Sequence, residues 1–355
     1  MLNSEQLKKY AFEILKVDKI SIGSTDRFKN APPDMSPFNM MPGAKSVIAF
    51  AQRIIRGCYR GIDEGTHWPS YQVFGYSGLN DIIGKTQYRL GRFIEREGYE
   101  AMPVPSSATL RERGPRGPRP EAGMPPREVT MNIRIAAVAA GLGEIGWSKV
   151  FLTEEFGPRQ RIGIILTDAE LEPDPIVTGK ICDHCKMCCK ECPGGALPKD
   201  ASVEICIDGK KMQWSDIDLG KCKLTHFGFN RKSSPHFVKK FPGVYLPIEQ
   251  QQLTWLEAWD FGWGLFSKVP TYAALSSHPV PICGARGCIV ACMKHLEKKG
   301  IIKNKFHNRH GFSDNKPWVL PEKPPVSLHH GFVYDPEADT NLDHSGAYVP
   351  PSEWY

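Results

Sequence analysis

The sequence predicts an α+β protein, in which an α/β domain over residues 1–175 precedes a smaller cysteine-rich domain over residues 176–300. Two observations lead to this division. The first 175 residues alternate amphipathic helical stretches with compact apolar runs that suit buried strands. All of the 11 cysteines except Cys58 lie in the second part or at its edges. Residues 301–355 form a tail rich in proline, histidine and aromatic residues, which we expect to pack on the domain or on a second subunit.

The α/β domain is predicted to begin with an amphipathic helix. Apolar side chains at helical spacing follow a candidate N-cap at Ser4; they are Leu7, Tyr10, Ala11, Ile14 and Leu15. Residues 44–54, AKSVIAFAQRI, follow a Pro-Gly turn and have the apolar character of a buried strand. A second helix is expected over residues 78–98, with Gly98 at its C-terminal cap.

A long proline-rich segment interrupts this domain. Residues 103–127 hold so many prolines and glycines that neither a helix nor a central strand can persist there, and a loop of this length is usually a lid or a binding loop. Its arginines, within 110–120, either form a solvated surface or contact an anionic substrate, cofactor or RNA. An alanine-rich helix then runs into a glycine turn at 141–146, and a buried strand follows within 160–171.

The composition is that of a soluble globular protein, with 41% hydrophobic and 24% charged residues. No apolar run approaches the roughly 18 residues of a membrane-spanning helix, and the N-terminus lacks the apolar core of a secretion signal. We therefore expect a cytoplasmic protein with no membrane partner. Because thiols stay reduced in the cytoplasm, the cysteines indicate metal ligation more than disulfides.

The densest cysteine group predicts iron–sulfur clusters. Cys182, Cys185, Cys188 and Cys192, followed by Pro193, form the pattern C-x2-C-x2-C-x3-C-P. Three thiolates at two-residue gaps can reach three irons of one cubane, and the fourth typically ligates the other cluster in two-cluster ferredoxins. We assign Cys182, Cys185, Cys188 and Cys292 to one [4Fe–4S] cluster, and Cys192, Cys222, Cys283 and Cys288 to the other.

A zinc site is the alternative for this group. Cys182 with Cys185, and Cys189 with Cys192, resemble two zinc knuckles. Only three residues separate the two pairs, whereas zinc ribbons usually place about 15–20 residues between them. The spacing therefore favours two iron–sulfur clusters. Two clusters alone need far fewer than 355 residues, so the added α/β domain suggests an enzyme in which the clusters feed electrons to a catalytic centre.

At this point the sequence resembles a known family. Residues 139–175, AAGLGEIGWSKVFLTEEFGPRQRIGIILTDAELEPDP, look like the catalytic core of the cobalamin-dependent reductive dehalogenases and of their relative epoxyqueuosine reductase. The glycine turn, the EFGP element and the LTD strand end occur in the order of that family, directly before the cysteine motif. Residues 42–51 and a cysteine like Cys222 also match the family pattern.

The resemblance implies a nitroreductase-like α/β corrinoid-binding domain followed by a two-cluster bacterial ferredoxin-like domain. The cofactors would be two [4Fe–4S] clusters and cobalamin. The glycines of the turn, Gly141, Gly143 and Gly146, could let the backbone approach a flat macrocycle, or they could simply form a tight helix-to-strand turn.

The resemblance also suggests catalytic residues. Glu128 is the candidate proton donor, and Arg161 would stabilise the developing anion. Apart from the resemblance, Tyr99 lies near the mouth of the proline-rich loop, and its phenol is a second candidate donor. Each has a structural alternative. Glu128 could cap a helix, Arg161 could pair with Glu154 or Glu155 at the surface, and Tyr99 could belong to the core.

The predicted function is reductive cleavage of a carbon–halogen or carbon–oxygen bond in a small organic substrate, with electrons from ferredoxin or flavodoxin. One alternative is a tRNA-modifying enzyme like epoxyqueuosine reductase, although the acidic V-D-T-x-P stretch of that enzyme is missing before the alanine-rich helix. The other is a non-catalytic electron-transfer or corrinoid-reactivating protein. A tail that packs on a second subunit would make the protein a homodimer.

Overall fold

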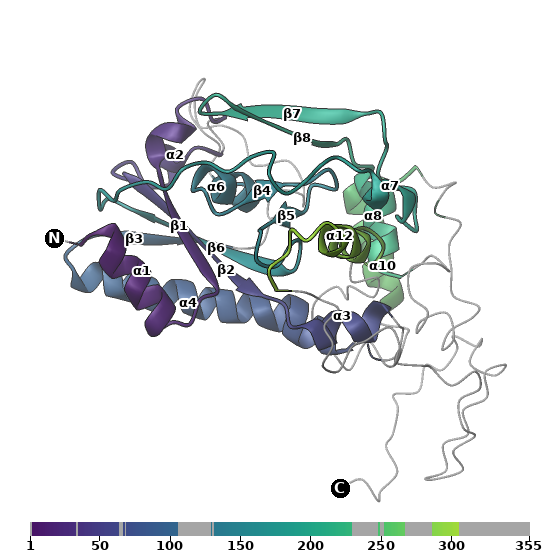
Figure 1. Cartoon of the computed structure of the whole chain (residues 1–355), viewed down its shortest axis with the longest axis horizontal. Coiled ribbons are helices and arrows are strands. Elements are labelled where there is room, and N and C mark those ends of the chain that lie inside the picture. Colours follow the sequence, from purple (N-terminus) through teal and green to yellow (C-terminus); the bar gives the residue numbers. More distant parts are fainter. Residues whose placement is uncertain are drawn as a thin grey trace, which may run out of the picture.

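The computed structural model describes residues 2–32, 35–63, 67, 69–105, 129, 131–228, 248, 252–266 and 286–304. Its centre is a four-stranded sheet in the order β1-β2-β6-β3, with every neighbouring pair antiparallel (Figure 1). The strands are β1 (Lys19–Ser24), β2 (Ser46–Arg53), β6 (Gln160–Thr167) and β3 (Ala101–Val104). The predicted mixture of helix and sheet is confirmed. The nitroreductase-like and ferredoxin-like arrangement of domains stays a prediction.

The two predicted strands lie side by side at the middle of the sheet. β2 and β6 pair with Ile48 opposite Ile165, and nearly all of their residues are buried. Alternate side chains enter two different apolar clusters, because successive residues of a strand point to opposite faces. Burial on both faces explains why both segments are continuously apolar rather than alternating with polar residues.

Helices cover both faces of this sheet (Figure 1). On one face, α1 (Ser4–Glu13) and α4 (Ser77–Arg96) bury their apolar stripes against Ile48 and Phe50. On the other face lies α6 (Ile133–Ala139), the predicted alanine-rich helix. Gly98 follows α4 with a φ of +88°, as expected for a C-terminal cap. The N-cap of α1 is Asn3 rather than Ser4, because the Asn3 side chain and Gln6 form a reciprocal capping box.

Shorter elements complete the described chain. They are η1 (Thr25–Phe28), α2 (Pro37–Met40), α3 (Arg56–Asp63), the π-helix η3 (Tyr71–Tyr76), β4 (Glu144–Ile145), β5 (Phe151–Leu152), α7 (Met187–Lys190), β7 (Ser202–Ile207), β8 (Lys210–Ser215), α8 (Leu219–His226), α10 (Trp255–Phe266) and α12 (Arg286–Lys298). β4 pairs with β5, and β7 forms a hairpin with β8.

An apolar cluster connects α3 and α4 to the later helices α8, α10 and α12. Tyr59 of α3 and Leu79 of α4 pack with Leu224 of α8, Trp259 of α10 and Met293 of α12. The cysteine-bearing helices are therefore held against the sheet domain by a shared core. No helix among the described residues has the length and apolar character needed to cross a bilayer. Glu128, Cys283, most of the proline-rich segment and the tail beyond residue 304 lie outside the described residues.

Candidate functional site

Four of the predicted cluster ligands come together from two distant segments. Cys182 and Cys185 lie in the loop before α7, Cys188 lies on α7, and Cys292 lies in α12, which packs directly against α7. The close approach of these two helices depends on Gly287, because a Cβ at that position would overlap the Glu191 carbonyl oxygen and the Pro193 ring. The fold therefore brings the fourth cysteine of this predicted set to the other three.

The electrostatics of these thiols show how closely they gather. Burial, together with the neighbouring thiols, raises the pKa of Cys188 to about 12. Burial also raises the pKa of Cys292 far above its usual value, with further contributions from Cys182, Cys188 and Cys185. Each thiolate thus opposes ionisation of the others, so four thiolates in this place need a bound cation or cluster to stabilise them. The arrangement fits a metal centre.

Backbone donors fix the first ligand of this group. The buried Glu144 carboxylate accepts hydrogen bonds from the backbone N–H groups of Lys180, Ile181 and Cys182, at 2.9, 3.0 and 2.5 Å. The Trp147 backbone N–H lies 3.4 Å from the Cys182 sulfur and donates to it. Such N–H···S bonds stabilise a thiolate and tune a cluster that it ligates.

A charged contact joins the cysteine loop to α12. The Asp183 carboxylate, next to Cys182, lies 2.9 Å from His295 Nε2 and 2.5 Å from Lys299 Nζ. Partial burial works against the charged carboxylate, but the hydrogen bonds from Lys299 and His295 outweigh it and lower the pKa of Asp183. This Asp183–His295–Lys299 contact holds the loop that carries Cys182 and Cys185 against the helix that carries Cys292.

The second predicted group is only partly within the described residues. Cys192 and Cys288 pack around the same apolar cluster as Trp147 and Cys188, and the Ala196 backbone N–H donates to the Cys192 sulfur at 3.4 Å. Cys222 lies on the neighbouring helix α8, which touches the loop after Cys192 so closely that a Cβ at Gly194 would overlap the Thr225 hydroxyl. Cys283 lies outside the described residues.

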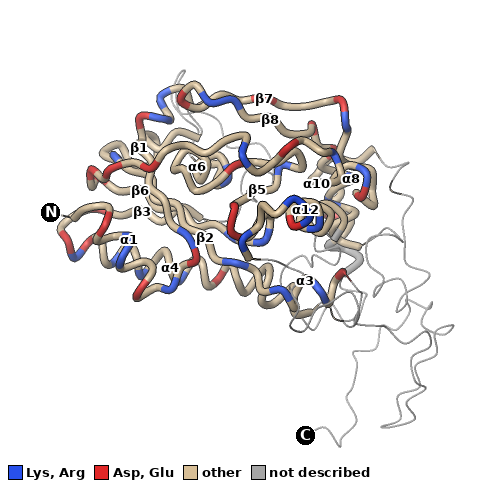
Figure 2. Tube along the Cα trace, viewed as in Figure 1, with Lys and Arg blue, Asp and Glu red and all other residues tan. Residues whose placement is uncertain are grey.

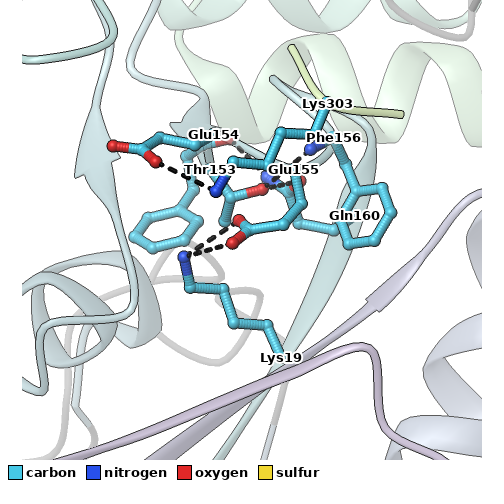
Figure 3. Close-up of polar contacts among 8 residues, drawn as sticks. Lys19, Thr153, Glu154, Glu155, Phe156, Gln160 and Lys303 are labelled. Atoms are coloured by element: carbon cyan, nitrogen blue, oxygen red, sulfur yellow. Dashed lines mark hydrogen bonds and ion pairs between the residues drawn. The ribbon is translucent and has the colours of Figure 1, made fainter. Parts of the chain in front are cut away.

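Arg161 does not form the surface ion pair that was its structural alternative. Glu155 pairs with Lys19 at 2.9 Å and Glu154 pairs with Lys303 at 3.4 Å, both in the turn before β6 (Figure 3). Arg161 instead donates to the Gly75 carbonyl oxygen and to the Tyr71 hydroxyl, each at 3.1 Å. Its guanidinium carbon also lies 4.2 Å from the centre of the Tyr76 ring.

A buried histidine extends this group toward the cysteines. The His226 ring lies 5.5 Å from the Tyr76 ring, and its buried Nδ1 has no hydrogen-bond partner among the described residues. Burial, with Lys223 and Arg161 nearby, holds the pKa of His226 well below its usual value, so the ring is neutral at pH 7. His226 is one helical turn from Cys222 on α8. We call Arg161, Tyr71, Tyr76 and His226 the polar cluster.

Tyr71, Tyr76 and His226 were missed from the sequence, since they belong to no motif. Tyr99, the phenol predicted as a second proton donor, does not belong to this polar cluster. It packs in the apolar cluster beside α1 and α4, two residues before Ala101, which pairs with Thr167 at the far end of β6 from Arg161. The structure therefore does not bring Tyr99 and Arg161 together.

The glycine turn packs against the chain itself. Gly141 has a φ of +83°, and a Cβ there would overlap the Pro175 carbonyl oxygen. A Cβ at Gly143 would overlap the Leu152 carbonyl oxygen, and one at Gly146 would overlap the Leu152 side chain. The described atoms thus explain all three glycines as a tight turn, the structural alternative stated above. Whether the turn also approaches a macrocycle stays a prediction.

Solved structures with similar folds come from two kinds of enzyme. Epoxyqueuosine reductase from Bacillus subtilis matches with a TM-score of 0.43 and 16% identity, over 84% of this chain and 83% of that one. A reductive dehalogenase, described with a mechanism for B12-dependent dehalogenation, matches with a TM-score of 0.42 and 16% identity, over 87% of this chain and 40% of that one.

Curated proteins are more similar to this chain in sequence than the solved structures are. No protein-family model matches the chain. The tetrachloroethene reductive dehalogenase of Dehalobacter restrictus is 30% identical over 196 residues, which are 54% of this chain and 30% of that protein. The enzyme of the same name from Sulfurospirillum multivorans is 37% identical over 93 residues, 24% of this chain and 18% of that protein. The matches thus span less than a third of either relative. The resemblance seen in the sequence is confirmed: about half of this chain is similar to tetrachloroethene reductive dehalogenases.

Proposed function

We propose that this chain is an iron–sulfur reductase that works with cobalamin and reductively cleaves a carbon–halogen or carbon–oxygen bond. One observation carries the proposal: in a relative of the reductive dehalogenases, Cys182, Cys185 and Cys188 lie around Cys292, a residue of a distant helix. Thiols this close favour a cluster, since a cubane needs four thiolate ligands in one place.

Two [4Fe–4S] clusters would relay electrons within the chain. The first would be held by Cys182, Cys185, Cys188 and Cys292, and the second by Cys192, Cys222, Cys283 and Cys288. Cys188 and Cys192 lie on consecutive turns of the same segment, so the two clusters would be close enough for electron transfer between them. A ferredoxin or flavodoxin would be the external electron donor.

Cobalamin, when bound, would supply a low-potential cobalt centre for the reduction. We place it in the domain of residues 1–175, where the glycine turn of residues 141–146 lies. The side chains of the polar cluster would act on the substrate directly. Arg161 carries a positive charge that can stabilise a departing anion. The Tyr71 hydroxyl lies 3.1 Å from that guanidinium and could donate a proton to the substrate as a general acid.

The first experiment is a cofactor count on protein purified without oxygen. We expect about eight irons and eight sulfides per chain, the content of two cubanes. Stoichiometric zinc with little iron would overturn the cluster assignment. Cobalamin should then stay with the protein through desalting. If the clusters are intact and cobalamin passes through, the chain is an electron-transfer protein instead.

The second experiment identifies the reaction. Reduced protein should be offered halogenated aromatics, epoxides and tRNA that carries the queuosine precursor. Turnover of a halogenated compound supports the main proposal, and turnover of the tRNA alone supports the epoxyqueuosine reductase alternative. The tRNA arm is included because one structure of epoxyqueuosine reductase contains a tRNA stem loop.

A further inference from the structure

The outer face of α4 carries a row of cations that the proposed site does not use. Lys85, Arg89, Arg92 and Arg96 follow one another at intervals of four, three and four residues. Residues at these intervals share one face of a helix, and all four side chains are exposed. At about 1.5 Å per residue the row extends for about 16 Å. Figure 2 shows the basic positions on α4 beside α1.

The three arginines of this row open onto a cleft. Together with Tyr10 of α1 they line a space of about 210 Å³. The Tyr10 ring stacks on Phe93 of α4, with 4.0 Å between the ring centres and 7° between the planes. This stacking fixes α1 beside α4, so one wall of the cleft is rigid and aromatic.

The arginines of the cleft have no protein counter-charge among the described residues. Asp81 and Glu95 lie on the same helix, yet neither pairs with Arg89, Arg92 or Arg96, and no other described carboxylate does so. Like charges three or four residues apart destabilise a helix. Repulsion among these side chains therefore destabilises α4 in the unliganded chain, and a bound anion would remove this repulsion.

We propose that this cleft binds a small phosphate-bearing anion. The planar guanidinium group donates two parallel hydrogen bonds to a phosphoryl group, and three guanidiniums around one cleft match a multiply charged anion better than a single carboxylate. The space of about 210 Å³ matches one or two phosphoryl groups, and Tyr10 lines it together with the three arginines. The site lies on the opposite side of α4 from the sheet and is independent of the proposed reaction.

Calorimetry on the full, cluster-loaded chain tests this site. Pyrophosphate should bind saturably at one site per chain, at constant ionic strength, and adenosine diphosphate should compete for it. Arg89→Gln combined with Arg92→Gln should raise the Kd at least tenfold. Lys210→Gln is a control for the loss of positive charge elsewhere, because it removes one exposed positive charge from the β7–β8 hairpin, and its Kd should be unchanged.

Thermal unfolding gives a second readout that does not depend on heats of binding. Without added phosphate the double variant should melt at the same temperature as the wild type or higher, because it has less charge repulsion. Pyrophosphate should raise the melting temperature of the wild type and of Lys210→Gln, but not that of the double variant. The proposal is overturned if pyrophosphate shifts all three proteins equally or shows no saturable binding. It is also overturned if an RNA oligonucleotide binds through these arginines and pyrophosphate does not displace it.

Discussion

Replacement of Cys292 by alanine should remove one cluster and leave the other. Cys292 lies on α12, while its three predicted partners lie on the loop and turn before Cys189, so its loss leaves three thiols without the fourth ligand. The iron content should fall from about eight to about four atoms per chain, one cubane of two. Iron and sulfide assays, with electron paramagnetic resonance of the reduced protein, measure this change.

Cys189→Ala is the matched control for this experiment. Cys189 is adjacent to Cys188 in the same short helix, but its sulfur lies 3.7 Å from the Pro198 carbonyl oxygen and it is assigned to no cluster. This variant should keep about eight irons. The ligand assignment is refuted if Cys189→Ala loses iron as Cys292→Ala does, or if Cys292→Ala keeps all of its iron.

Three further predictions address the surroundings of the clusters. Asp183→Asn should lower the free energy of unfolding of the metal-free chain by about 1 kcal/mol, since it weakens the partly exposed ion pair with Lys299 and the contact with His295. In urea unfolding, Glu204→Gln, which breaks one exposed pair with Lys211, should cost less. Stability should fall by about 1 kcal/mol between about pH 7 and pH 5.5, because the unfolded chain binds a proton at His226 that the folded chain, with its lowered pKa, does not. His226→Gln should flatten this slope, and an unchanged slope would contradict the assignment. Tyr71→Phe should keep both clusters yet lower turnover by about 10²–10⁴-fold if its hydroxyl donates the proton; turnover at the wild-type rate would return that role to Glu128.

The local elements of this protein could be predicted because their signals are local. The apolar runs at 44–54 and 160–171 contain β2 and β6, and Gly98 ends α4 as its position suggested. The cysteine spacing predicts three ligands of one group without any knowledge of the fold, because consecutive ligands of a cubane are a few residues apart. The helical spacing of α1 was visible, but its cap was not, since Asn3 competes with Ser4 through a bond to Gln6.

The polar cluster was decided by the tertiary structure alone. Arg161 was found from a motif, but its partners Tyr71, Tyr76 and His226 come from a π-helix and from α8, and no spacing along the chain relates them. The separation of Tyr99 from Arg161 has the same cause: nearness to the proline-rich loop in sequence does not tell which end of β6 a residue reaches. The glycines of the turn show the converse. Their sequence pattern allows a cofactor or a tight turn equally. Only the fold shows that the Pro175 and Leu152 carbonyl oxygens occupy the positions that Cβ atoms at Gly141 and Gly143 would need. Spacing along the chain determines which residues can share a turn or a helix face, whereas contacts between distant segments depend on how the whole core packs.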